Sequence, residues 1–208
     1  MKQRSFFIVS LSWVDWLTMS SLLLSVIGLL CAFHENLPLA IVFMLLAMFV
    51  DMLDGLLARR FRLDSEFGRY LDGFCDVFTY LLLPLFILYQ FGMQDMYSVT
   101  VLFIFLVCGL LRLSRFNIVG TVEEKNVQFH VGLQVIWSQL VVVFAFPAWS
   151  WLGSPARYPL MLVLLIMSFF MVRNILVPKP IQYTLLTVII LSVAGVYTYL
   201  HFSGVRTP

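Results

Sequence analysis

Four aspartates, Asp51, Asp54, Asp72 and Asp76, lie in or beside two long apolar runs of this sequence. An ionised carboxylate in hydrocarbon costs a few kcal/mol, and carboxylates that lie close together also repel one another. Such a group is stable only when cations hold it. Carboxylate oxygens in this number suit divalent ions such as Mg²⁺, Mn²⁺ or Ca²⁺, and a pair of ions can clamp phosphates during an in-line displacement.

The spacing of the aspartates predicts that they converge. Asp51 and Asp54 are three residues apart, while Gly68, Asp72 and Asp76 follow one another at intervals of four. On a helix of about 3.6 residues per turn, each of these sets lies on one face. The segment between the two sets is short, so the two helices are expected to be antiparallel neighbours. All four carboxylates can then meet at one side of the membrane.

Small residues and one arginine accompany the aspartates. Gly55, Ala58 and Gly68 have little or no side chain, which lets a ligand approach the helix backbone closely. Arg59 carries a planar, permanent positive charge that suits a phosphate. The set therefore predicts carboxylates for metal, small residues for access and an arginine for a diphosphate.

Two other interpretations of these residues remain open at this point. The pairs Asp51–Arg59 and Asp72–Arg69 would also be compatible with plain ion pairs. Acidic residues inside a membrane are also typical of cation-coupled or proton-coupled transporters. A transporter site more often lies near the midplane between repeats with broken helices. Here the acids crowd towards one membrane face and no repeat is visible, which favours an enzyme.

The elements that must position these residues are membrane-spanning helices. The 208 residues are 62% hydrophobic and only 12% charged, which excludes an ordinary soluble domain, and nothing in the sequence indicates a nucleic-acid partner. We expect an all-α integral membrane protein, a polytopic bundle of about six or seven transmembrane helices with a polar cavity on the cytoplasmic side. The expected spans are Trp13–Phe33, Pro38–Ala58, Arg69–Gln90, Tyr97–Phe116, Val131–Leu152, Tyr158–Val172 and Ile181–His201.

The distribution of basic residues predicts the orientation of the chain. Most lysines and arginines fall at the ends of spans on one side, while Arg157 and Arg206 fall on the other. By the positive-inside rule the N-terminus and the aspartates face the cytoplasm, in a bacterial-type inner membrane. We interpret residues 1–208 as a single domain in which residues 1–12 form an interfacial lead-in.

The motif across residues 51–76 resembles the signature of the CDP-alcohol phosphotransferase family. The sequence reads D51-x-x-D54-G55-x-x-A58-R59, then eight residues, then G68-x-x-x-D72-x-x-x-D76. The resemblance implies transfer of a phosphatidyl or phosphoalcohol group from a CDP-linked donor, here CDP-diacylglycerol in a membrane, to an alcohol, with release of CMP. It also implies two divalent ions, Mg²⁺ or Mn²⁺, and a possible homodimer.

The same resemblance assigns roles by position. It implies that the four aspartates hold the metal and that Asp76 is also the general base that accepts the proton of the acceptor hydroxyl. The residues that it implies for binding CDP are Asp54, Gly55, Ala58, Arg59 and Gly68.

Two further segments resemble the phosphatidylserine synthase branch of this family. Residues 111–117, LRLSRFN, are similar to the RLARFN segment of that branch. Residues 129–133, FHVGL, are similar to the start of its FxGLPxP segment, with Gln134 and Ile136 in place of the two prolines. Arg112 and Arg115 are three residues apart and are candidates to bind the acceptor through a carboxylate or a phosphate. Serine is the leading acceptor, while glycerol 3-phosphate and inositol phosphate remain alternatives.

Overall fold

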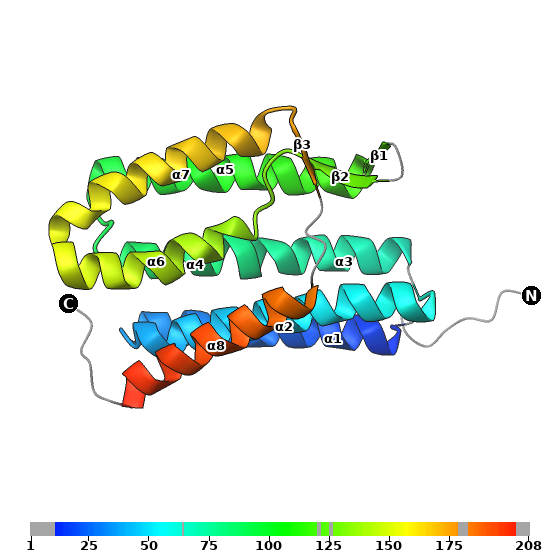
Figure 1. Ribbon diagram of the computed structural model, residues 1–208, viewed down its shortest axis with the longest axis horizontal. Coiled ribbons are helices and arrows are strands. Elements are labelled where there is room, and N and C mark those ends of the chain that lie inside the picture. Colours follow the sequence, from blue (N-terminus) through cyan, green and yellow to red (C-terminus); the bar gives the residue numbers. More distant parts are fainter. Residues whose placement is uncertain (1–10, 64, 120–121, 125–126, 179–182, 203–208) are drawn as a thin grey trace, which may run out of the picture.

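The computed structural model describes residues 11–63, 65–119, 122–124, 127–178 and 183–202 as a bundle of helices (Figure 1). Residues 1–10 of the expected lead-in, and Ile181 and Gln182 of the last expected span, lie outside these ranges. Five helical segments among the described residues are long and apolar enough to cross a membrane: Trp13–Phe33, Leu37–Phe61, Glu66–Gln90, Met96–Ile118 and Ser154–Val172. Together with two shorter apolar helices, they confirm the expected polytopic all-α membrane architecture.

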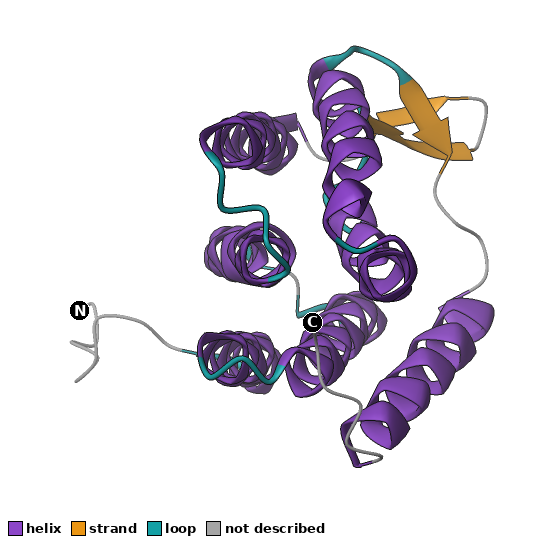
Figure 2. Cartoon of the chain, turned by 90° about the vertical axis from the view of Figure 1, so that its left-hand side faces the viewer, coloured by secondary structure: helices purple, strands orange, loops and turns teal. Residues whose placement is uncertain are grey.

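The chain begins with four long helical passes. These are α1 (Trp13–Phe33), α2 (Leu37–Phe61), a continuous helical pass made of α3 (Glu66–Asp76), a π-helical segment η1 (Val77–Leu82) and α4 (Leu83–Gln90), and then α5 (Met96–Val119). The remaining elements are α6 (Trp137–Leu152), the short 3-10 helix η2 (Ser154–Ala156), α7 (Arg157–Val172) and α8 (Tyr183–Phe202). Viewed from the end of the bundle in Figure 2, most of the helices are seen along their axes.

The sixth helix starts later than the sequence predicts. It was expected from Val131, but α6 begins at Trp137. Val131 instead ends a strand, and Gly132 adopts a φ of +79°, a left-handed conformation that interrupts a helix. A Cβ atom at Gly132 would lie 2.6 Å from the carbonyl oxygen of Met171, so the close approach of α7 also requires glycine here.

Three short strands form a small antiparallel sheet that the sequence analysis did not predict. Strand β1 (Val122–Glu124) pairs with β2 (Val127–Val131), and β2 pairs with β3 (Leu176–Pro178). The order is β1-β2-β3, so the connection after α5 is tied to the connection after α7. Figure 1 places this sheet at the end of the bundle where α3 begins.

Helix α1 packs on α2 through a stripe of small residues. Ser21, Ser25, Gly28 and Ala32 are all buried on α1, at intervals of three or four residues. At Gly28 an added Cβ atom would lie 3.2 Å from the Cβ of Phe43, so the two helices are in close contact there. Small residues are common at helix interfaces in membranes because they let backbones approach closely.

The π-helical segment η1 is held from α6. Pro84 has no N–H group, so it cannot donate to the carbonyl of Tyr80 four residues earlier or to that of Thr79 five residues earlier. Two side chains of α6 donate instead, Ser138 Oγ to the Tyr80 carbonyl at 2.5 Å and Gln139 Nε2 to the Thr79 carbonyl at 3.2 Å. The irregular backbone is therefore satisfied inside the bundle, as membrane proteins require.

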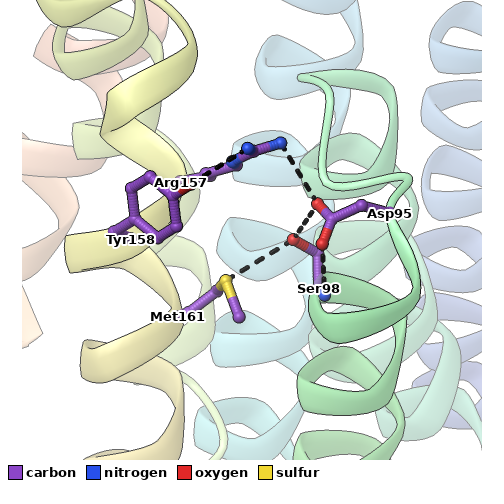
Figure 3. A network of polar contacts seen from close by, with 5 residues as sticks. All are labelled: Asp95, Ser98, Arg157, Tyr158 and Met161. Atoms are coloured by element: carbon purple, nitrogen blue, oxygen red, sulfur yellow. Dashed lines mark hydrogen bonds and ion pairs between the residues drawn. The ribbon is translucent and has the colours of Figure 1, made fainter.

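A polar network ties α5 to α7 at the opposite end from the sheet (Figure 3). Asp95 accepts hydrogen bonds from the backbone N–H and the hydroxyl of Ser98, at 3.2 and 2.7 Å, and so caps α5. Arg157 at the start of α7 reaches Asp95 at 3.4 Å and also donates to the hydroxyl of Tyr158 at 3.1 Å. The Ser98 hydrogen bond, with a smaller contribution from Arg157, lowers the pKa of Asp95.

Candidate metal and nucleotide site

Three of the four aspartates meet between α2 and α3. Carboxylate oxygens of Asp51, Asp72 and Asp76 lie within 4.8 Å of one another, and each of these residues is half-buried. Asp51 comes from the last turns of α2 and the other two from α3, as the helical spacing predicts. We call these three residues the carboxylate cluster.

Asp54 lies one turn beyond Asp51 on α2 and is more deeply buried. Its side chain is only 3% exposed, and its Oδ2 atom has no hydrogen-bond partner. It does not belong to the cluster within 4.8 Å, but its charge interacts with those of Asp72 and Arg59. The fourth aspartate is therefore placed beside the cluster rather than in it.

The cluster has the properties of a cation site. At an effective dielectric constant of about 20, two carboxylates this far apart repel by about 3 kcal/mol. Oδ1 of Asp51 is buried without a hydrogen-bond partner, like Oδ2 of Asp54. Among the described residues, the structure has one ion pair, Arg157–Asp95, and it lies at the other end of the bundle. Ion pairs of the aspartates with arginines therefore do not explain the cluster. Oxygen donors of this kind fit a divalent metal ion.

The residues expected to bind CDP line the same part of α2 and α3. A Cβ atom at Gly55 would be 3.7 Å from Nη1 of Arg59, which shows that the exposed guanidinium folds back over this glycine. Ala58 is half-buried on the same helix. Gly68 lies in the first turn of α3, where its backbone N–H donates to Oγ of the N-cap residue Ser65 at 2.8 Å.

Contacts from α1 and α5 fix the position of α3. An added Cβ atom at Gly68 would lie 3.0 Å from Oδ1 of Asp15, a residue buried at the start of α1. At Gly73, between the two cluster aspartates of α3, an added Cβ atom would overlap the side-chain amide of Asn117 on α5. These close approaches explain why α3 carries glycines on two sides.

The two arginines proposed for the acceptor are placed differently. Arg112 is only 8% exposed, its guanidinium lies 5.1 Å from the ring centroid of Phe116, and its Nε atom is buried without a hydrogen-bond partner. Its charge interacts with that of Asp76. Arg115 is exposed. The structure therefore brings Arg112, and not Arg115, towards the buried side of the site.

Tyr80 is a site residue that the sequence analysis missed. Its hydroxyl donates to Oδ2 of Asp51 at 2.7 Å, and its side chain is 4% exposed. The available signal was its position, because Tyr80 continues the interval of four set by Gly68, Asp72 and Asp76.

An apolar groove lies between α6 and α7, with a volume of about 510 Å³. Its lining contains no polar residue other than the indole of a tryptophan, and the residues are Leu133, Trp137, Leu140, Val141, Phe144, Leu160, Val163 and Met167. Such a surface is suited to lipid rather than to a charged substrate.

Comparison with known proteins places these features in a family. A model of the CDP-alcohol phosphatidyltransferase family matches residues 12–200. The CDP-diacylglycerol–serine O-phosphatidyltransferase of Bacillus subtilis is 26% identical over 129 residues, covering 61% of this chain and 71% of the relative. The enzyme of the same name from Methanocaldococcus jannaschii is 30% identical over 129 residues, covering 62% and 57%.

A phosphatidylcholine synthase from Rhizobium johnstonii is also similar, with 31% identity over 134 residues that cover 62% of this chain and 53% of the relative. The match therefore spans little more than half the length of two of these three relatives. The family match covers most of this chain, and it includes every residue of the carboxylate cluster. The resemblance seen in the motif is confirmed, and the chain belongs to the CDP-alcohol phosphatidyltransferase family.

Proposed function

We propose that this protein transfers a phosphatidyl group from CDP-diacylglycerol to an alcohol in a metal-dependent reaction, with serine as the acceptor. The observation that carries the proposal is the carboxylate cluster: three acidic side chains within 4.8 Å, with a buried carboxylate oxygen that has no partner. The chain that carries this cluster belongs to the CDP-alcohol phosphatidyltransferase family.

The residues of the cluster and those beside it have separate proposed roles in the reaction. Bound divalent ions would be held by Asp51, Asp54, Asp72 and Asp76 and would supply charge stabilisation for the diphosphate. Arg59, folded over Gly55, is placed to contact a phosphate of CDP, and Gly68 and Ala58 leave room for the nucleotide.

Asp76 is the proposed general base. It accepts the proton from the acceptor hydroxyl, whose oxygen then forms a bond to the phosphorus atom that carries the diacylglycerol. The bond from this phosphorus to the bridging oxygen of the diphosphate breaks, and CMP leaves with the electron pair. One P–O bond forms and one breaks, so the reaction needs no redox partner.

Arg112 favours an anionic acceptor. Its buried guanidinium has an unpartnered Nε atom and interacts with Asp76, so a carboxylate or phosphate on the acceptor would gain a hydrogen bond close to the base. Serine has such a carboxylate, while choline carries a positive charge that Arg112 would repel. This supports serine over the choline acceptor suggested by the names of the phosphatidylcholine synthase relatives.

The proposed reaction takes place at the cytoplasmic side of a cell membrane. Arg59, Arg60, Arg62 and Arg69 lie around the site end of α2 and α3, which supports this orientation by the positive-inside rule. The proposed unit is the single domain of residues 1–208, acting on lipid that reaches the site from the membrane. A homodimer is what the family resemblance implies.

An acceptor panel tests the proposal. Purified protein in detergent micelles with CDP-diacylglycerol and Mn²⁺ or Mg²⁺ receives labelled serine, glycerol 3-phosphate, inositol phosphate or choline in separate reactions. We expect phosphatidylserine and CMP in equal amounts, and no product when EDTA is present. Product from another alcohol with none from serine would show that the acceptor is wrong, and CMP-independent ion flux in vesicles would show a transporter instead.

A further inference from the structure

A hydrogen bond from η1 holds one oxygen of the carboxylate cluster. The Tyr80 hydroxyl donates to Oδ2 of Asp51 at 2.7 Å, and the tyrosine is 4% exposed. The other oxygen of the same carboxyl group, Oδ1, is buried without a partner. One oxygen of Asp51 is therefore fixed by the protein, and the other is left for a ligand.

The position of Tyr80 is itself fixed by contacts from two other helices. Pro84 cannot donate to the carbonyl of Tyr80 or Thr79, and Ser138 and Gln139 of α6 donate hydrogen bonds to these two carbonyls. The hydroxyl of Thr79 also lies 2.8 Å from that of Ser25 on α1. These contacts from α6 and α1 restrain the π-helical segment at Thr79 and Tyr80.

We propose that Tyr80 is a positioning residue for metal binding, which acts by holding the carboxyl group of Asp51 in the orientation that a divalent ion requires. The proposal rests on the proposed function and adds to it a residue beyond the motif of residues 51–76. Side chains that hydrogen-bond to a metal ligand orient it, and their loss commonly weakens metal binding or activity by about 10- to 100-fold.

The tyrosine that reaches Asp51 lies within the π-helical segment η1. Tyr80 continues the interval of four set by Gly68, Asp72 and Asp76, and its hydroxyl donates to Asp51 from the turn that follows α3. Single-turn π segments often occur at functional sites. Here the segment begins at Val77, the residue directly after the proposed base Asp76.

The test compares two tyrosine-to-phenylalanine variants. Tyr80→Phe removes the hydroxyl that holds Asp51. Tyr197→Phe is the matched control, because the hydroxyl of Tyr197 is also buried but donates to the carbonyl of Val143, between α8 and α6, at 2.6 Å. Mn²⁺ binding to each purified variant in detergent is measured by electron paramagnetic resonance without substrate, and the Mn²⁺ concentration that gives half-maximal transfer is measured separately.

We expect Tyr80→Phe to bind Mn²⁺ about 10-fold or more weakly than the unaltered protein, with a matching rise in the Mn²⁺ concentration for half-maximal rate. Most of the rate should return at saturating Mn²⁺. Tyr197→Phe should bind Mn²⁺ as the unaltered protein does, even if its melting temperature falls. Equal Mn²⁺ affinity in Tyr80→Phe and Tyr197→Phe would overturn the proposal.

A double variant checks that Tyr80 acts through Asp51. Adding Tyr80→Phe to Asp51→Ala should weaken Mn²⁺ binding no further than Asp51→Ala alone, because the hydroxyl then has no carboxyl group to hold. A second full 10-fold loss in the double variant would show that Tyr80 affects the site by another route. If the unaltered protein binds Mn²⁺ but transfers to no alcohol, the proposed function fails, whereas the Tyr80 comparison still stands.

Discussion

The guanidinium of Arg59 lies over Gly55 on the preceding turn of α2, so that a Cβ atom at Gly55 would be 3.7 Å from Nη1 and 3.9 Å from Nη2. These are ordinary van der Waals distances, and among the described residues no other atom lies within 4 Å of the added atom, apart from those of Gly55, its chain neighbours and the adjoining backbone of the same helix. The folded protein therefore tolerates alanine at this position. If glycine is required there, the requirement comes from a ligand.

This relationship predicts opposite effects at two glycines. Gly55→Ala should leave the melting temperature unchanged or raise it, because alanine favours a helix over glycine by up to about 1 kcal/mol. It should nevertheless reduce transfer at least 10-fold if a nucleotide must pack against this turn. Thermal unfolding in detergent and an assay of CMP release measure the two effects.

Gly73→Ala is the matched comparison on α3. Its added Cβ atom would overlap the side-chain amide of Asn117, so we expect a loss of about 1–3 kcal/mol in stability. A Gly55→Ala protein that is destabilised as much as Gly73→Ala would contradict the geometry of both sites.

Neutralising one aspartate of the cluster should raise stability when no metal is present. Asp72→Asn removes repulsion with two neighbouring carboxylates that lie within 4.8 Å, so the variant should melt at a higher temperature than the unaltered protein in EDTA. The order should reverse, or the difference should shrink, on addition of Mn²⁺, because the ion stabilises only the complete cluster. A variant that is less stable than the unaltered protein in EDTA would show that the cluster is not under electrostatic repulsion.

The variant Asp76→Asn tests the proposed role of Asp76 as general base. We expect transfer and CMP release to fall by at least 100-fold while the protein remains folded, since the amide cannot accept the proton of the acceptor hydroxyl. Measured CMP release close to that of the unaltered protein would remove Asp76 from the role of base.

Arg112 and Arg115 should differ in their effect on the acceptor. Arg112→Ala removes a buried guanidinium beside Asp76, so the KM for serine should rise about 10-fold or more while the KM for CDP-diacylglycerol changes less. Arg115→Ala, at an exposed position, should have the smaller effect on the KM for serine. Steady-state kinetics with each substrate varied in turn measure both, and equal effects would argue against a direct role for Arg112.

The charge of Asp95 should make a pH-dependent contribution to the stability of the fold, at the other end of the bundle. Its pKa is lowered in the folded protein, chiefly by the hydrogen bond from Ser98, so its charged form stabilises the fold. This contribution is present above the pKa of the unfolded chain, about 3.9, and is lost as the pH falls through the lower pKa of the folded state. Asp95→Asn should therefore melt slightly below the unaltered protein at pH 7 with the same transfer activity.

The difference between the two proteins should disappear as the pH approaches the lowered pKa. Melting curves recorded for both at neutral and acidic pH measure it. A difference in melting temperature that stays constant down to acidic pH would mean that the charge of Asp95 does not contribute to stability.

The sequence alone determined the helical bundle, the family and the convergence of three aspartates. Hydropathy and the intervals between Asp51 and Asp76 are local properties of the chain, and a helix converts them directly into faces and spans. For the same reason the boundaries of most helices agree with expectation, except where Gly132 delays α6.

Only the tertiary structure decided which partners meet across helices. It placed Arg112 at the buried side of the site and Arg115 at the surface, and it set Asp54 beside the cluster. It also brought Tyr80 to Asp51, because Pro84 and the side chains of α6 shape a π-helical turn there. The interval of four places Tyr80 on the face of Asp72 and Asp76, but contacts between separate helices depend on how those helices pack, which an interval within one segment does not specify.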